Sequence, residues 1–219
     1  MTKIIQFLHP GIEHNEKTGI LWNTKKHRRK YLKIQGEYID AIESNPKLDS
    51  IYFWGEWEAQ SSIKKINKNK YSFPHFIFEP YLSLPLPKNA CNTDPFVFGN
   101  CFYYCFCKQT RYTKLRNLES GSIILFGSNK NNFFEIDTVF VIKDSFKYNV
   151  DNLNTLKPNY NTIFYNTSLL PLINPENVFI EQQTMNSCYN KKSDCKENSN
   201  LEYYIYSAVM HEDRHNFNG

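Results

Sequence analysis

Glycine is scarce in this sequence: 8 of its 219 residues are glycine, and most of them stand alone. Phosphate-binding loops and dinucleotide-binding turns need clustered glycines, which let the backbone approach a ligand closely. Neither pattern occurs here, and the nucleophile elbow and the protein-kinase motifs are also missing. The sequence therefore argues against a P-loop nucleotide hydrolase and against a Rossmann-type enzyme.

Long apolar runs are missing too. The mean hydropathy is −0.58, and no apolar run approaches the roughly 20 residues that a membrane-spanning helix needs. The N-terminal apolar run is cut short by Pro10 and charged residues, so we expect no signal peptide. These features predict a cytoplasmic protein with no membrane partner, in which the six cysteines are reduced thiols.

Aromatic residues, in contrast, are abundant, with 15 Tyr and 17 Phe. Both residue types favour strands, so the composition points to β structure. Basic charge is concentrated early in the chain. Residues 1–72 hold 13 Lys and Arg against 8 Asp and Glu, which gives +5, whereas the remainder holds 13 against 14, which gives −1. This excess suits a partner that carries phosphate groups.

Short apolar and aromatic runs recur along the chain and are typical of strands. The predicted strands cover residues 3–8, 49–60, 73–78, 96–109 and 201–209. Residues 120–143 predict a hairpin whose loop, at residues 127–132, has about four to six residues. We expect an α+β fold dominated by antiparallel strands, arranged as a curved or barrel-like sheet with a few short helices.

Polar, asparagine-rich segments divide the chain. We expect a main β-rich domain over residues 1–147, a polar linker over 148–162 and a smaller C-terminal segment over 163–219. The C-terminal segment would pack on the main domain through the strand at 201–209. About two helical turns are expected within residues 37–44, because the chain then meets Asn45 and Pro46.

The segment FWGEWE, residues 53–58, combines indoles and carboxylates. On a strand, Trp54, Glu56 and Glu58 share one face. The opposite face carries Phe53, Gly55 and Trp57. Trp54 could stack on a nucleobase while Glu56 or Glu58 accepts hydrogen bonds from its edge. The alternatives are a core tryptophan with solvated glutamates, and a catalytic pair of carboxylates.

A basic run occupies residues 25–30, between Trp22 and Tyr31. We expect it to be exposed, because burying so many charges would cost too much free energy. Basic side chains interleaved with aromatic ones suit contact with a phosphate backbone. The candidate phosphate-binding residues are Lys25, Lys26, Arg28, Arg29 and Lys30. A second basic run at residues 63–70 supports this interpretation, and the alternative is a solvated charged edge.

Two further groups of polar residues are candidates. Asn92 and Asp94 could lie at the mouth of a pocket beside Lys108 and Gln109, although Asn and Asp before Pro95 are also typical of a turn. His211 and His215 match the H-E-x-x-H pattern, which binds zinc on a helix with the intervening Glu as general base. The preceding residues are strand-like, so zinc is an alternative and no cofactor is the main expectation.

Four cysteines, at positions 91, 101, 105 and 107, crowd one strand-like region. Their overall spacing, C-x9-C-x3-C-x-C, is not a standard zinc pattern. Cys101, Cys105 and Cys107 share strand parity, so we expect them to pack inward as small hydrophobic side chains.

The segment from Leu115 to Gly121, followed by the apolar run Ile123–Phe126 and a strand from Phe133, resembles one element of the PUA-like group, which includes the ASCH and EVE domains. The resemblance covers at most residues 50–145. It implies a small β-barrel with an aromatic-lined pocket for a base or modified base, in which Trp54 would stack. Other pieces, such as His9–Gly11 and Gly55–Trp57, resemble bacterial proteins of uncharacterised function, and that resemblance implies no activity.

The leading function is therefore recognition of nucleic acid or a nucleotide, with a modified base as one option, through an aromatic and acidic pocket beside a basic patch. A metal-dependent hydrolase or nucleotide-processing enzyme is the second hypothesis. It would use His9, His14, Glu56, Glu58 or residues 211–215. A protein-interaction module is the third. The sequence leaves catalysis and the oligomeric state open.

Overall fold

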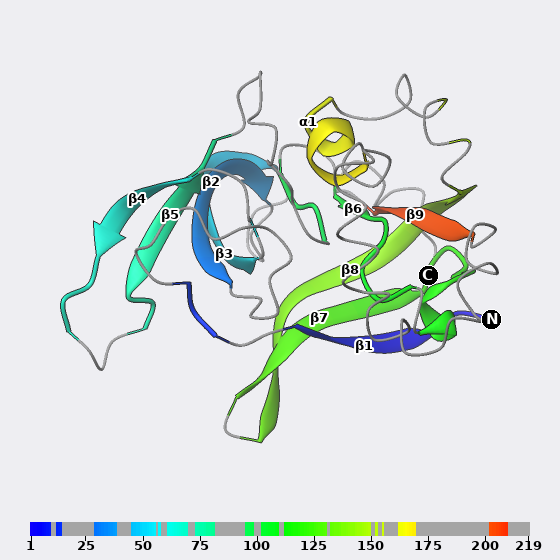
Figure 1. Ribbon diagram of the computed structural model, residues 1–219, viewed down its shortest axis with the longest axis horizontal. Coiled ribbons are helices and arrows are strands. Elements are labelled where there is room, and N and C mark those ends of the chain that lie inside the picture. Colours follow the sequence, from blue (N-terminus) through cyan, green and yellow to red (C-terminus); the bar gives the residue numbers. More distant parts are fainter. Residues whose placement is uncertain are drawn as a thin grey trace, which may run out of the picture.

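Two β-sheets hold most of the residues that the structure describes (Figure 1). The computed structural model describes residues 1–9, 12–14, 29–38, 45–55, 57, 61–69, 73–81, 95–98, 102–109, 112–130, 132–149, 152, 155, 162–169 and 202–209. Strands far outnumber helices among these residues, so the expected β-dominated α+β fold is confirmed.

The larger sheet has five strands in the order β1-β7-β8-β9-β6. Its members are β1 (Ile4–His9), β7 (Ile123–Lys130), β8 (Phe133–Tyr148), β9 (Tyr203–Ala208) and β6 (Tyr103–Tyr104). β1 and β7 are parallel, and the other pairs are antiparallel. The long strand β8 pairs first with β7 and then with β9, so the predicted C-terminal strand lies within this sheet.

The smaller sheet has four strands in the order β3-β2-β5-β4. Its members are β3 (Lys47–Gly55), β2 (Lys30–Tyr38), β5 (Phe76–Pro80) and β4 (Ser61–Ile66). Only β2 and β5 are parallel. Neither sheet closes into a barrel within the described strands. Of the helix expected at 37–44, residues 37 and 38 instead end β2, and residues 39–44 lie outside the described part.

Helical structure is short. Within the described residues, the helical elements with defined bounds are the 3-10 turn η1 (Thr113–Leu115), the helix α1 (Thr162–Phe164) and the π-helical turn η3 (Tyr165–Leu169). Leu115 is buried, and Phe164 and Leu169 are fully buried. These turns therefore serve to place apolar side chains in the core, rather than forming a layer of their own.

The predicted hairpin is present and extends away from the other strands (Figure 1). Its loop is shorter than expected, because Lys130 pairs with Phe133. The sequence predicts a loop for the polar residues from Gly127 to Lys130, but they continue β7 after a register shift between Phe126 and Gly127. Asn132 has a φ of 67°, a left-handed conformation that asparagine tolerates better than most residues.

Residues 96–109 are not the continuous strand that their composition predicts. Among the described residues, only the two-residue strand β6 and a bridge between Phe96 and Tyr103 form here. Lys108 has a φ of 64°, which a regular strand does not allow. Cys105 is buried in one core and Cys107 packs against the other. The two thiols therefore do not face one way, and Cys91 and Cys101 lie outside the described residues.

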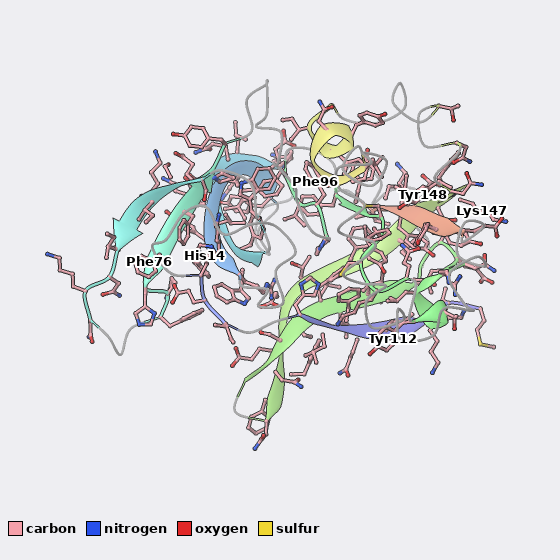
Figure 2. The ribbon with its side chains drawn as sticks, viewed as in Figure 1. His14, Phe76, Phe96, Tyr112, Lys147 and Tyr148 are labelled. Carbon is pink, nitrogen blue, oxygen red and sulfur yellow. The ribbon has the colours of Figure 1, made fainter. Side chains whose placement is uncertain are left out.

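Two hydrophobic cores lie on these sheets. The first collects residues from the smaller sheet, from α1 and from β9, including Leu32, Phe78, Phe96 and Phe164. Phe96 packs on Phe164 with ring centroids 5.3 Å apart, and it lies beside α1 in Figure 2. The second core fills the inner face of β1, β7 and β8. β9 supplies side chains to both cores and so ties them together.

Candidate functional site

The pairing of β2 with β3 divides their side chains between two faces. Leu32 lies opposite Phe53 and faces the first core, where Trp57 is also buried with 1% of its surface exposed. Tyr31 lies opposite Trp54 on the other face. The predicted separation of Trp54 from Trp57 is therefore confirmed. Glu56 and Glu58 lie outside the described residues.

Four rings gather on this second face, and we call them the aromatic cluster: Tyr31, Tyr52, Trp54 and Phe73. The rings of Trp54 and Phe73 meet edge to face with centroids 5.1 Å apart, and Tyr31 stacks on Tyr52 at 6.4 Å. Tyr52 is 46% exposed and Phe73 is 50% exposed, whereas Trp54 is only 8% exposed. Trp54 therefore supports the cluster, and the accessible ring surface belongs to Tyr52 and Phe73.

Arg29 lies beneath the cluster. Its guanidinium carbon is 5.6 Å from the Trp54 ring centroid, and it donates a hydrogen bond to the Trp54 carbonyl oxygen. It also forms an ion pair with Asp137 of β8. Burial raises the pKa of the Asp137 carboxyl, and the positive charge of Arg29 offsets part of that rise. Arg29 thus joins the cluster to the larger sheet.

The expectation that the whole basic run is exposed is wrong for its last two residues. Arg29 is 1% exposed and Lys30 is 5% exposed. The Lys30 ammonium donates to the Ser61 hydroxyl at 2.8 Å and lies 5.4 Å from the Phe78 ring centroid. The buried charges of Arg29 and Lys30 are tolerated because each group donates to hydrogen-bond acceptors and lies near an aromatic ring. Lys25, Lys26 and Arg28 lie outside the described residues.

Lys33 is the described basic residue of β2 that stays partly exposed on the face of the aromatic cluster. It lies directly opposite Tyr52 in the β2–β3 ladder. Side chains in such cross-strand positions have Cβ atoms about 4.5–5.5 Å apart. The Lys33 side chain therefore lies next to Tyr52, the more exposed of the two stacked tyrosines.

Lys108 and Gln109 lie on the larger sheet. The Gln109 side chain is fully buried, donates to the Tyr204 carbonyl at 2.7 Å and accepts from the Tyr204 amide at 2.9 Å. The Gln109 side chain thus hydrogen-bonds to the β9 backbone as a neighbouring strand would. Lys108 donates to the Leu8 carbonyl and lies 4.7 Å from the Phe7 ring centroid. Both side chains hold the fold, and Asn92 and Asp94 lie outside the described residues.

An acid–imidazole pair at the start of β5 was missed by the sequence analysis. The Glu13 carboxylate accepts from the backbone amides of His75 at 2.7 Å and Phe76 at 3.0 Å. Its other oxygen lies 2.5 Å from His75 Nδ1. This contact joins residues 62 positions apart, so no local spacing could have revealed it. Its evident role is to fix the start of β5, just after Phe73.

The histidines proposed for an enzyme are largely enclosed. His9 is 4% exposed and packs between Phe7 and Phe126, and His14 is 9% exposed and meets Phe78. Within the described ranges, no group of three or more His, Cys, Asp or Glu is placed to hold a metal ion. His211 and His215, the alternative zinc ligands, fall outside those ranges.

Comparison of the chain with protein families, with curated proteins and with solved structures returned no match. The PUA-like resemblance therefore stays a prediction. Over the residues that the structure describes, no helix is long and apolar enough to span a membrane.

Proposed function

We propose that this protein recognises nucleic acid or a nucleotide through the aromatic cluster, with Tyr52 and Phe73 as the stacking rings. The observation that carries the proposal is a pair of half-exposed rings on one sheet face, with Lys33 opposite Tyr52. Sheet faces that present rings in this way suit unpaired bases, because every base offers a π face.

The chemistry of phosphate groups supports the same face. Lys33 lies beside the rings, and the chain segment that leads directly into β2 contains Lys25, Lys26 and Arg28. Contacts with phosphate release counterions and give binding a steep dependence on salt. In this proposal the basic segment supplies charge without sequence preference, and the rings supply stacking.

Trp54 and Arg29 act as supports in this proposal. The indole packs against Phe73 and Tyr31, while the guanidinium below it is held by the Asp137 carboxylate. A ring that is already held in place loses little conformational entropy when a base stacks on it. Glu56 and Glu58, which follow β3 directly, would read the polar edge of the stacked base.

The test is fluorescence anisotropy of a labelled, unstructured oligonucleotide, titrated at several salt concentrations. Base stacking is worth about 1–3 kcal/mol per ring, so Tyr52→Ala and Phe73→Ala should each weaken binding about tenfold. Phe133→Ala is the matched control, because Phe133 is 73% exposed on the hairpin. Absence of binding at low salt, or an equal loss in all three variants, would refute the proposal.

A further inference from the structure

The strands β1, β7 and β8 are apolar on both faces. Their inner face fills the second core with Phe7, Ile124, Phe126 and Phe140. On their outer face, the pairing registers place the residues in three cross-strand rows. Across β1, β7 and β8 these rows are Ile4, Ile123 and Val141; Gln6, Leu125 and Val139; and Leu8, Gly127 and Ile136.

Seven of these nine outer positions are aliphatic and none is charged. We call the seven residues the aliphatic face: Ile4, Leu8, Ile123, Leu125, Ile136, Val139 and Val141. Four of them are strongly exposed, with Ile4 at 71%, Val139 at 56%, Ile136 at 53% and Leu8 at 44%. The other three are partly exposed.

Such a surface is unusual for a sheet that faces water. An antiparallel sheet with one solvated face normally alternates apolar and polar residues, whereas strands that are apolar on both faces are normally covered on both sides. Contiguous apolar patches on a protein surface mark interaction sites. Burial of the inner face alone does not account for the outer residues of these three strands.

We propose that the aliphatic face is the interface of a homodimer, in which a second copy of this chain packs its own aliphatic face against it. The face carries no charge, so two identical faces can meet about a two-fold axis without like-charge contact.

Shape favours the same occupant. The face is formed by three neighbouring strands, and two sheets pack face to face about 10 Å apart when aliphatic side chains interdigitate. A helix would contact only a stripe of such a surface.

The size of the face sets the expected strength. The exposed fractions of the seven side chains correspond to on the order of 500 Å² per copy, below the roughly 800 Å² per partner of a standard interface. We therefore expect a dimer that dissociates in the micromolar range rather than an obligate one. This interface lies on the larger sheet and does not depend on the proposed function of the smaller sheet.

Sedimentation velocity of the full chain tests the proposal. Between roughly 1 and 500 μM, a range that spans micromolar dissociation, the wild type should shift from monomer to dimer. Val139→Glu should stay monomeric, since it places a carboxylate at the centre of the face. Leu48→Glu, at a 73% exposed position on β3, is the control and should dimerise as the wild type does.

A second variant guards against misfolding. Gln6 is already polar and exposed in the middle row of the face, so Gln6→Glu should keep the fold intact while adding charge to the interface. It should weaken the dimer at least tenfold, with an unchanged circular dichroism spectrum. A wild type that stays monomeric throughout the range overturns the proposal, as does a dimer that tolerates both Val139→Glu and Gln6→Glu.

Discussion

At the scale of the residue, Arg29 is where the two sheets meet. It donates to the Asp137 carboxylate on β8 as an ion pair, donates to the backbone of Trp54 on β3 and lies under the Trp54 ring. The sequence placed this residue in an exposed basic run. It could not predict the burial, because the compensating carboxylate is 108 positions away.

Arg29→Met should destabilise the protein by about 3–5 kcal/mol at pH 7, because it leaves the Asp137 carboxylate buried without its partner. Asp137→Leu combined with Arg29→Met should cost much less than the sum of the two single changes. Urea unfolding of the four proteins measures the coupling. Additive losses would mean that the ion pair contributes nothing beyond its separate parts.

The pH dependence of that loss has a defined sign. Burial already raises the pKa of Asp137, and loss of Arg29 removes an influence that lowers it. A carboxyl with a raised pKa in the folded state favours folding below its unfolded pKa, about 3.9, and loses that contribution as the pH rises. The destabilisation by Arg29→Met should therefore shrink between pH 7 and pH 4.

Tyr206 gives a second prediction at this scale, at the alkaline end. Its buried hydroxyl donates to the Leu115 carbonyl and accepts from the Leu118 amide. Burial raises its pKa well above the usual 10.0. Below pH 10.0 the hydroxyl is neutral in both the folded and the unfolded state. At higher pH the unfolded chain releases the proton and the folded protein keeps it, so folding is weakened.

Tyr206→Phe should thus cost about 1–2 kcal/mol at pH 7, through the lost hydrogen bonds, and progressively less above pH 10. Urea unfolding of both proteins at pH 7, 9, 10.5 and 11.5 measures the difference. Tyr112→Phe, at an exposed tyrosine, controls for general effects of alkali. A constant difference across this range would contradict the proposed titration.

At the scale of the element, the period of apolar residues predicted β1, β3, β5, the β7–β8 hairpin and β9. It failed where residue type and pairing disagree. Polarity predicts a loop for the residues after Gly127, although they pair with β8. Composition predicts a strand for residues 96–109, although most of those described fill two cores from irregular backbone. The polarity of a side chain indicates its exposure to solvent more directly than it indicates whether its backbone pairs in a sheet.

The register shift of the hairpin depends on Gly127. A Cβ atom there would lie 2.2 Å from the Glu135 carbonyl oxygen, a backbone atom that cannot move alone. Gly127→Ala should therefore destabilise the protein by about 2–3 kcal/mol, in the range of a forced backbone shift. Thermal unfolding measures the loss, and amide exchange along β7 and β8 should show where the pairing opens.

Gly36→Ala is the matched control for that change. Its added Cβ would meet Ile51 Cδ1 at 2.6 Å, the far end of a flexible side chain that can turn aside. The loss should stay near 1 kcal/mol or below. Equal losses at the two positions would show that the backbone contact at Gly127 is not what restricts it to glycine.

At the scale of the whole molecule, the sequence located one residue of the candidate site and missed its neighbours. Strand parity separated Trp54 from Trp57 correctly. Tyr52 shares the parity of Trp54 on β3, but Tyr31 and Phe73 come from two other segments, so parity alone could not assemble the aromatic cluster. The aliphatic face was hidden for the same reason, because parallel pairing of β1 with β7 joins residues more than 110 positions apart.

The two proposed surfaces make a joint prediction about ligand length. A dimer carries two aromatic clusters, and a single strand long enough to reach both binds the second site at an effective concentration in the millimolar range. Wild-type affinity should therefore rise about 10²-fold or more from a short to a long oligonucleotide at protein concentrations where the dimer forms.

Val139→Glu should bind the short oligonucleotide as tightly as the wild type does. Its affinity should rise with oligonucleotide length only because a longer strand offers more overlapping binding positions. Tyr52→Ala should dimerise normally and bind both lengths weakly. Anisotropy titrations with a length series, paired with sedimentation of the same samples, separate the two surfaces. If wild type and Val139→Glu gain equally with length, the clusters of a dimer do not share one strand, even where each surface works alone.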